Sequence, residues 1–223
     1  MKMQLIEKKQ LQSSVYSFVF RPDQQVTWQP GQYMHYVLAH PDADDRGIER
    51  WFTISSAPYE KNIMITTRFS YEKSSSFKKA LTELKVGDEI EADGPKGSFT
   101  YKEGDYRHVF IAGGIGITPY HSMLAELAHE NKPANTDLLY ANNDDNFVFG
   151  DELAAIAAHD PTLQIKKFVD KRISDQDLAP YAKQANAIFY LSGPRAMVEN
   201  YEEVLKNLGV EADRVMTDYF PGY

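Results

Sequence analysis

The sequence predicts two domains of different classes: an antiparallel β-barrel, followed by an α/β domain with a Rossmann-like parallel sheet. In the first hundred residues, short alternating apolar segments are separated by turns and only one helical pattern occurs, which is typical of a small barrel. From Tyr106 onward, strand-like and helix-like segments alternate, which indicates a parallel sheet covered on both faces. A length of 223 residues suits two modest domains. We expect them over residues 1–102 and 106–223.

The expected barrel strands are rich in β-branched and aromatic residues, and turn signals such as Gln29-Pro30-Gly31-Gln32 separate them. They cover residues 15–20, 33–38, 50–56, 63–69 and 89–92, and a second turn covers residues 94–99. One short helix is predicted over residues 77–84, with Ser76 as its N-cap. The acidic stretch 41–47 is expected to form an exposed loop.

The expected parallel sheet is built from four apolar segments, which alternate with amphipathic ones. The strands are predicted over residues 107–112, 137–141, 163–168 and 187–192, and the helices over residues 118–130, 150–158 and 195–207. The connection between the two domains is expected near residues 101–105.

A glycine-rich turn follows the first strand of the expected parallel sheet. Gly113, Gly114 and Gly116 precede Thr118 and Pro119, and proline fits the first turn of a helix. A strand, a glycine turn and a helix N-terminus together form an anion site, because free N–H groups and the helix dipole point toward the ligand. Glycine is also used in tight strand-to-helix turns that bind nothing, and Pro119 stands where the dinucleotide fingerprint would have its third glycine.

Two further loops are expected at the same edge of the sheet, because ligands of parallel sheets bind beyond the carboxyl ends of the strands. Ser192, Gly193 and Pro194 follow the fourth strand. Asn142 and Asn143 follow the second strand. These loops and the glycine turn could together bind one dinucleotide.

The barrel contains a second candidate site at Arg50, Trp51, Phe52 and Thr53. These residues offer a cation, flat aromatic faces and a hydroxyl group, which suit a phosphate attached to a stacked ring. The alternative is an arginine in a surface ion pair, with the aromatic residues in the core.

Composition excludes several classes of function. The chain has no cysteine, which excludes disulfides, zinc–thiolate sites and iron–sulfur clusters held by this chain, and its six histidines show no ligand spacing, so no metal site is predicted. The net charge of −8 makes nucleic acid an unfavourable partner. No apolar run approaches 18 residues and the start lacks a signal-peptide core, so we expect no membrane insertion and a cytoplasmic location.

Four ordered motifs resemble those of the ferredoxin–NADP reductase superfamily. Arg50-x-Phe52-Thr53-x-x-Ser56 resembles the flavin motif Arg-x-Tyr/Phe-Ser/Thr-x-x-Ser, and Gly94-Pro95-x-Gly97-x-Phe99 resembles the barrel-closing turn. The stretch from Gly113 to Pro119 resembles the nicotinamide-domain signature. Ser192-Gly193-Pro194-x-x-Met197 resembles Cys-Gly-Pro-x-x-Met. The resemblance covers essentially the whole chain.

The resemblance implies a flavin held by the barrel and NAD(P)H held by the second domain. Arg50 would pair with a flavin phosphate, Phe52 would lie along the isoalloxazine ring, and Thr53 would reach its N5 edge. The strand with Thr66, Thr67 and Arg68 would run past the diphosphate and ribityl region, and Ser75 and Ser76 would cap the diphosphate. FAD is favoured over FMN, because both elements on the diphosphate side are present.

Two positions depart from the family pattern. Ser192 replaces the usual cysteine beside the nicotinamide ring, where it can still shape the pocket. Relatives often end with a carboxylate, one residue and an aromatic ring that covers the flavin. Asp218 and Phe220 match that pattern, with Tyr223 as the alternative ring.

The choice of nicotinamide depends on the end of the second strand. Residues 142–145 contain no cation but include Asp144 and Asp145, which would repel the 2′-phosphate of NADP and could accept a hydrogen bond from NAD. NADH is therefore favoured over NADPH. The alternative is that these aspartates face solvent and Lys171 or Arg172 reaches the phosphate.

The resemblance therefore implies an oxidoreductase that passes electrons from NAD(P)H through bound FAD to a separate one-electron acceptor. With no cluster in the chain, that acceptor would be a ferredoxin-like protein, a haem protein or an oxygenase component. The alternatives are a free-standing flavin or ferric reductase that acts on small acceptors, and a flavin-binding regulatory subunit without turnover.

Overall fold

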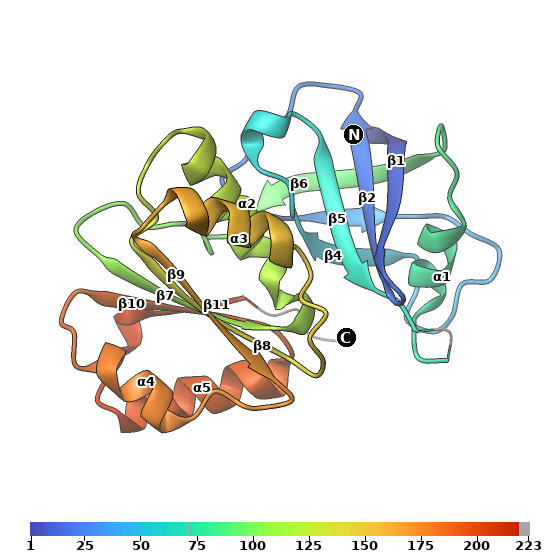
Figure 1. The fold of residues 1–223 in the computed structure, drawn as a ribbon. Helices are drawn as coiled ribbons and strands as arrows, with labels where there is room; N and C mark the ends of the chain where they lie inside the picture. Colours follow the sequence, from blue (N-terminus) through green and yellow to red (C-terminus); the bar gives the residue numbers. More distant parts are fainter. Residues whose placement is uncertain (71, 219–223) are drawn as a thin grey trace. The chain divides into compact units, whose positions relative to one another are not determined.

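The computed structural model describes residues 1–70 and 72–218, which form two compact units that divide after Thr100 (Figure 1). The first unit is an antiparallel six-stranded sheet with one α-helix, and the second is a parallel five-stranded sheet with α-helices on both faces. The predicted fold class is confirmed.

The first unit contains strands in the order β4-β3-β6-β1-β2-β5. Their bounds are β1 Lys2–Gln12, β2 Val15–Pro22, β3 Tyr33–Val37, β4 Glu49–Thr53, β5 Ile63–Arg68 and β6 Glu89–Lys96. The two edge strands meet where β4 ends, because the Ser55 N–H donates to the Met64 carbonyl of β5 over 2.8 Å. Helix α1, Ser76–Glu83, lies between β5 and β6 in the sequence.

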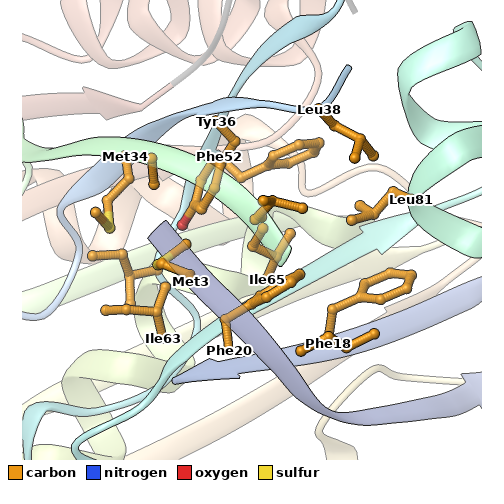
Figure 2. Packing of buried hydrophobic residues seen from close by; sticks show 14 of the residues in the cluster. Met3, Phe18, Phe20, Met34, Tyr36, Leu38, Phe52, Ile63, Ile65 and Leu81 are labelled. Carbon is orange, nitrogen blue, oxygen red and sulfur yellow. The ribbon is translucent and has the colours of Figure 1, made fainter. Parts of the chain in front are cut away.

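One hydrophobic core fills this unit, and Figure 2 shows part of it. Alternate residues of each strand point inward, as with Phe18 and Phe20 of β2 and Ile63 and Ile65 of β5. Helix α1 adds Phe77 and Leu81, both fully buried. Each such side chain contributes about 1.5–3 kcal/mol by leaving water.

Three features of this unit differ from the sequence predictions. Strand β1 was not predicted, because only Met3 and Leu5 of its residues are buried and most of the others are polar. Strand β6 continues to Lys96, which pairs with Tyr33, so the first three residues of the predicted turn, 94–96, belong to a strand. The N-cap of α1 is Ser75, one residue before the predicted Ser76, because the Ser75 hydroxyl accepts from the Lys78 N–H over 3.3 Å.

The second unit has five parallel strands in the order β11-β10-β7-β8-β9. Their bounds are β7 Arg107–Gly113, β8 Thr136–Asn142, β9 Leu163–Val169, β10 Ala187–Ser192 and β11 Val215–Asp218. The helices are α2 Thr118–His129, α3 Gly150–His159, α4 Asp175–Ala182 and α5 Arg195–Asn207. In Figure 1, α2 and α3 lie on one side of the sheet, and α4 and α5 lie on the other.

Both faces of this sheet are packed, which explains why its inner strands β7, β8 and β10 contain continuous apolar runs. Val109 and Ile111 of β7 belong to the core cluster that includes α4 and α5. Phe110 points to the other face, where its ring stacks on Tyr120 of α2 at 4.5 Å between centroids. Helix α4 and strand β11 were not predicted. The only fully buried residue of α4 is Leu178 and the helix contains Pro180, while β11 has only four residues.

Candidate functional site

The N-terminus of α1 is tied to the loop 41–47. The Ser76 N–H donates to the Asp44 carboxylate and the Asp44 N–H donates to the Ser76 hydroxyl, each over 2.9 Å. The bond from Ser76 is the main cause that lowers the pKa of Asp44 to about 2. The expectation of a simple exposed acidic loop is therefore wrong at Asp44, which caps a helix.

Arg50 of β4 lies beneath this loop and is only 9% exposed. Its Nη1 donates to the carbonyl of Arg46 over 2.6 Å and also to that of Glu49. Its Nη2 is buried and has no hydrogen-bond partner within residues 1–70 and 72–218. A buried N–H donor of a charged group without an acceptor is costly, so this atom fits an anionic group that binds here.

Two more cations lie near Arg50. Arg46 contacts the Asp44 carboxylate at 2.8 Å and donates to the Ser74 carbonyl at 3.3 Å, just before α1 begins. The amine of Lys78 is half-buried, and burial, Arg50 and Arg46 lower its pKa to about 8. We call Arg46, Arg50 and Lys78 the α1 cation cluster. Three cations at a helix N-terminus suit a phosphate or diphosphate.

Three residues of this site were not predicted from the sequence: Asp44, Arg46 and Lys78. One signal was available for Lys78, because a basic residue in the first helical turn opposes the helix dipole and is unusual there. Arg46 and Asp44 carried no comparable signal, since their places depend on how the loop 41–47 folds back on α1.

Strand alternation separates the aromatic residues that the sequence placed together. Phe52 faces the core near α1, with its ring 5.9 Å from both Tyr36 and Phe77, and Figure 2 shows it among the core side chains. Trp51 points to the opposite face, is 37% exposed, and packs at 4.4 Å on His35. Arg50 and Phe52 are therefore on one face, without Trp51. Thr53 ends β4 and is buried.

The candidate residues of β5 also divide by face. The Thr66 hydroxyl is bonded to the hydroxyls of Ser17, at 2.7 Å, and Ser55, at 2.9 Å. Arg68 donates from Nη1 to the Ser14 hydroxyl at 3.3 Å. Thr67 is also buried, but its side chain points to the opposite face from Thr66 and Arg68, the face that carries Ile63 and Ile65.

In the second unit, the glycine turn is helical. Residues Gly114–Ile117 form a 3-10 helix that leads directly into α2. The Thr118 N–H consequently donates to the Ile115 carbonyl. Helix α2 begins at Thr118, as predicted. The first amides without helical partners, however, belong to the glycine turn that precedes it. Thr118 and Pro119 themselves are buried.

Packing accounts for two of the three glycines. A Cβ on Gly116 would lie 2.2 Å from the Ser192 carbonyl oxygen, and a Cβ on Gly113 would lie 2.3 Å from the sulfur of Met197. Gly114 has φ +54° and its missing Cβ would meet only the Asn142 side chain, at 3.9 Å. Gly113 and Gly116 therefore let neighbouring loops approach, while Gly114 keeps open backbone toward Asn142.

Strand β10 brings the Ser192 loop to the same edge of the sheet. Gly193 follows, and Pro194 begins α5 as its N-cap. Ser192 is aligned with Asp218 of β11, and its hydroxyl donates to that carboxylate at 3.3 Å, with both residues at least nine-tenths buried. Phe220 and its alternative Tyr223 lie outside the described residues.

The end of β8 forms a closed loop around Asn142. Its amide nitrogen donates to the Asp144 carboxylate and the Asn146 carbonyl, each at 2.9 Å, and Asp144 also accepts from the Asn146 N–H. The carboxylate of Asp144 is thereby fixed close to Asn142, although Asp144 is exposed, as are Asn143 and Asp145. Of the two candidate aspartates, Asp144 is the one held beside the glycine turn.

Residues 1–70 and 72–218 contain no helix that is long and apolar enough to cross a membrane. Within the same residues, no three histidine, aspartate or glutamate side chains gather as a metal site would require.

Comparison with protein families assigns both units. Residues 2–101 match the oxidoreductase FAD-binding domain, and residues 110–203 match the oxidoreductase NAD-binding domain. The order of these domains agrees with the order of the two compact units.

Individual relatives agree with the family models. The chain is 29% identical to a flavohemoprotein of Vibrio cholerae, over 97% of this chain and 58% of the relative. It is 33% identical to the phenoxybenzoate dioxygenase subunit beta of Ectopseudomonas oleovorans, over 78% of this chain and 54% of the relative. It thus spans somewhat more than half the length of these relatives. The FAD/NAD-binding domain of a Vibrio cholerae nitric oxide dioxygenase has the same fold, with a TM-score of 0.84, 24% identity and 98% of each chain covered.

Proposed function

The chain belongs to the oxidoreductases that join an FAD-binding domain to an NAD-binding domain, as ferredoxin–NADP reductases do, and from that premise we propose that it oxidises NADH and passes the electrons through FAD to a separate one-electron acceptor. When bound, the flavin supplies the chemistry that accepts a hydride and releases electrons one at a time. The protein residues bind, orient and shield the reacting groups.

The observation that carries the proposal is the buried Nη2 of Arg50 at the α1 cation cluster. The Nη1 atom of Arg50 donates to backbone carbonyls, whereas its Nη2 atom is left for a ligand. An anion supplied by a flavin phosphate would satisfy this donor, with Ser75 and Ser76 at the adjoining helix N-terminus. Thr53, which ends β4, would lie toward the N5 edge of the flavin ring. The expectation that Phe52 lies along that ring is not kept, because the Phe52 ring packs in the core against Tyr36 and Phe77.

In the second unit, the proposed nicotinamide site is the edge formed by the glycine turn, the Ser192 loop and the Asn142 loop. The amides of Gly114–Gly116 would bind the pyrophosphate, and Asn142 with Asp144 would face a ribose. Ser192, fixed by Asp218, would shape the pocket around the nicotinamide ring. Asp144 supports NADH over NADPH.

The proposed acceptor is a ferredoxin-like protein, a haem protein or an oxygenase component. Relatives support this class, because they include a flavohemoprotein and a dioxygenase subunit.

The test is reduction of the bound flavin. Purified protein is saturated with FAD, made anaerobic and mixed with one equivalent of NADH, and the visible absorption band of the flavin is followed. We expect rapid bleaching, and then recovery of the band with cytochrome c as a one-electron acceptor. Protein that takes up neither FAD nor FMN would contradict flavin binding. If the protein binds flavin but NADH does not bleach that flavin, the alternative of a regulatory subunit without turnover is supported.

A further inference from the structure

Lys78 lies in the first turn of α1, three residues after the N-cap Ser75. Side chains of a helix lean toward its N-terminus, so the Lys78 amine is carried back toward the α1 N-terminus. There it donates to the carbonyl of Arg68 over 3.3 Å and lies 6.0 Å from the ring centroid of Phe52. The amine is therefore located between the two strands that carry the proposed flavin residues.

The charges near this amine are mostly positive. Arg50 of β4 and Arg46 of the loop 41–47 both act on Lys78. The carboxylate of that loop, Asp44, is bonded to the Ser76 N–H and to Arg46. The guanidinium of Arg68 on β5 contacts Ser14.

Such an arrangement costs stability in the free protein, because a half-buried ammonium group faces two arginines and the positive end of a helix dipole. The pKa of Lys78 is lowered to about 8, first by burial and then by Arg50 and Arg46. An anion placed among the three cations would offset both the repulsion of Lys78 by the two arginines and its unfavourable interaction with the helix dipole. A diphosphate carries charge that two or three cations can share.

We propose that Lys78 is a further flavin-binding residue, whose ammonium group contacts a phosphate of the flavin together with Arg50. The proposal rests on flavin binding by this unit, as proposed above. It makes flavin affinity depend on pH. The free protein loses the Lys78 proton as pH rises through about 8, whereas the bound phosphate holds that proton to higher pH, so binding above pH 8 takes up a proton from solvent.

The neighbouring Lys79 provides a matched control, because it is on the same helix but exposed. FAD is titrated into flavin-free protein at pH 7 and pH 9, and quenching of flavin fluorescence gives Kd. If the protonated amine is required, the wild-type Kd increases about tenfold between these two pH values. Lys78→Met should bind FAD more than tenfold more weakly at pH 7 and lose most of the pH dependence. Lys79→Met should behave like the wild type.

Two further arms separate a phosphate contact from a structural role. Lys78→Arg keeps the positive charge but does not titrate in this range, so it should bind FAD equally at pH 7 and pH 9. Riboflavin, which lacks phosphate, should bind the wild type and Lys78→Met equally. If Lys78→Met and Lys79→Met bind FAD alike, with the wild-type pH dependence, the role of Lys78 is overturned and flavin binding stands. If the wild type binds no flavin at either pH, the proposed function is overturned as well.

Discussion

The hydroxyl of Ser192 donates to the carboxylate of Asp218 over 3.3 Å, across two parallel strands whose residues 192 and 218 are in register. Both residues are at least nine-tenths buried at the carboxyl end of the sheet. Asp218 also contributes to raising the pKa of the Tyr120 phenol, although burial is the larger cause. A charged group fixed at this depth keeps the Ser192 oxygen in one orientation.

Removing this hydroxyl should slow flavin reduction without weakening flavin binding. A hydrogen bond to a charged group contributes about 1.5–3 kcal/mol, so Ser192→Ala should reduce the rate of NADH-dependent bleaching by about tenfold or more in stopped-flow measurements. Thr217→Ala is the control, because residue 217 alternates with Asp218 on β11 and points to the other face. Equal rates for Ser192→Ala and the wild type would remove Ser192 from the nicotinamide site.

Arg50→Ala should weaken FAD binding by about 1.5–3 kcal/mol, the range for hydrogen bonds to a charged group. The reason is the buried Nη2 that we assign to a flavin phosphate. The measurement is fluorescence titration with FAD, and circular dichroism checks the fold. Arg21→Ala is the control, since Arg21 is exposed on β2. An unchanged Kd for Arg50→Ala would place the phosphate elsewhere.

Gly116→Ala should destabilise the second unit, because the new Cβ would be 2.2 Å from the Ser192 carbonyl oxygen. Overpacking costs about 1–3 kcal/mol, and a backbone atom cannot move aside as a side chain can. Urea unfolding measures the loss. Gly150→Ala serves as the comparison, since its Cβ would meet nothing nearer than 3.2 Å. FAD affinity should remain at the wild-type value in both variants. Similar stability for the two would show that the loops can separate without cost.

The buried imidazole of His108 should make the protein less stable in mild acid. Burial is the main cause that lowers the pKa of His108, whose ring is stacked on Tyr101 at 4.0 Å. Since the folded pKa is below the unfolded value of about 6.5, this contribution to stability is present above that pH and is lost as pH falls. Tm should therefore fall less between pH 7 and pH 5 in His108→Phe than in the wild type. The exposed His129, changed to Asn, should leave the wild-type pH dependence.

The parallel sheet was predictable because three of its strands, β7, β8 and β10, lie inside the sheet and have continuous apolar runs, while β9 alternates apolar and polar residues at the edge. The fifth, β11, is short, and nothing local distinguishes Val215–Asp218 from a loop. Among the candidate site residues, the sequence grouped Arg50 with Trp51, but side chains alternate along a strand and the structure separates them. The α1 cation cluster depends on contacts between loop 41–47 and a helix more than 25 residues later, for which no local pattern exists.

Asp144 should make the protein prefer NADH to NADPH. The 2′-phosphate that distinguishes NADP carries a charge near −2, and a carboxylate beside it would repel it. Asp144 is held next to Asn142 by bonds of 2.9 Å, and Asn142 faces the open side of Gly114, so its charge is fixed at the proposed ribose position. We expect kcat/KM for NADH to exceed that for NADPH by at least about tenfold, equivalent to about 1.4 kcal/mol.

Asp144→Asn preserves the acceptor oxygen but removes the charge, so it should raise kcat/KM for NADPH and narrow the ratio of the NADH to the NADPH value. Asp145→Asn removes the same charge from an exposed neighbour and should leave the ratio unchanged. Stopped-flow flavin reduction with each nucleotide decides between these outcomes. Equal rates for NADH and NADPH in the wild type would instead direct attention to Lys171 and Arg172, which follow the next strand and could reach the phosphate.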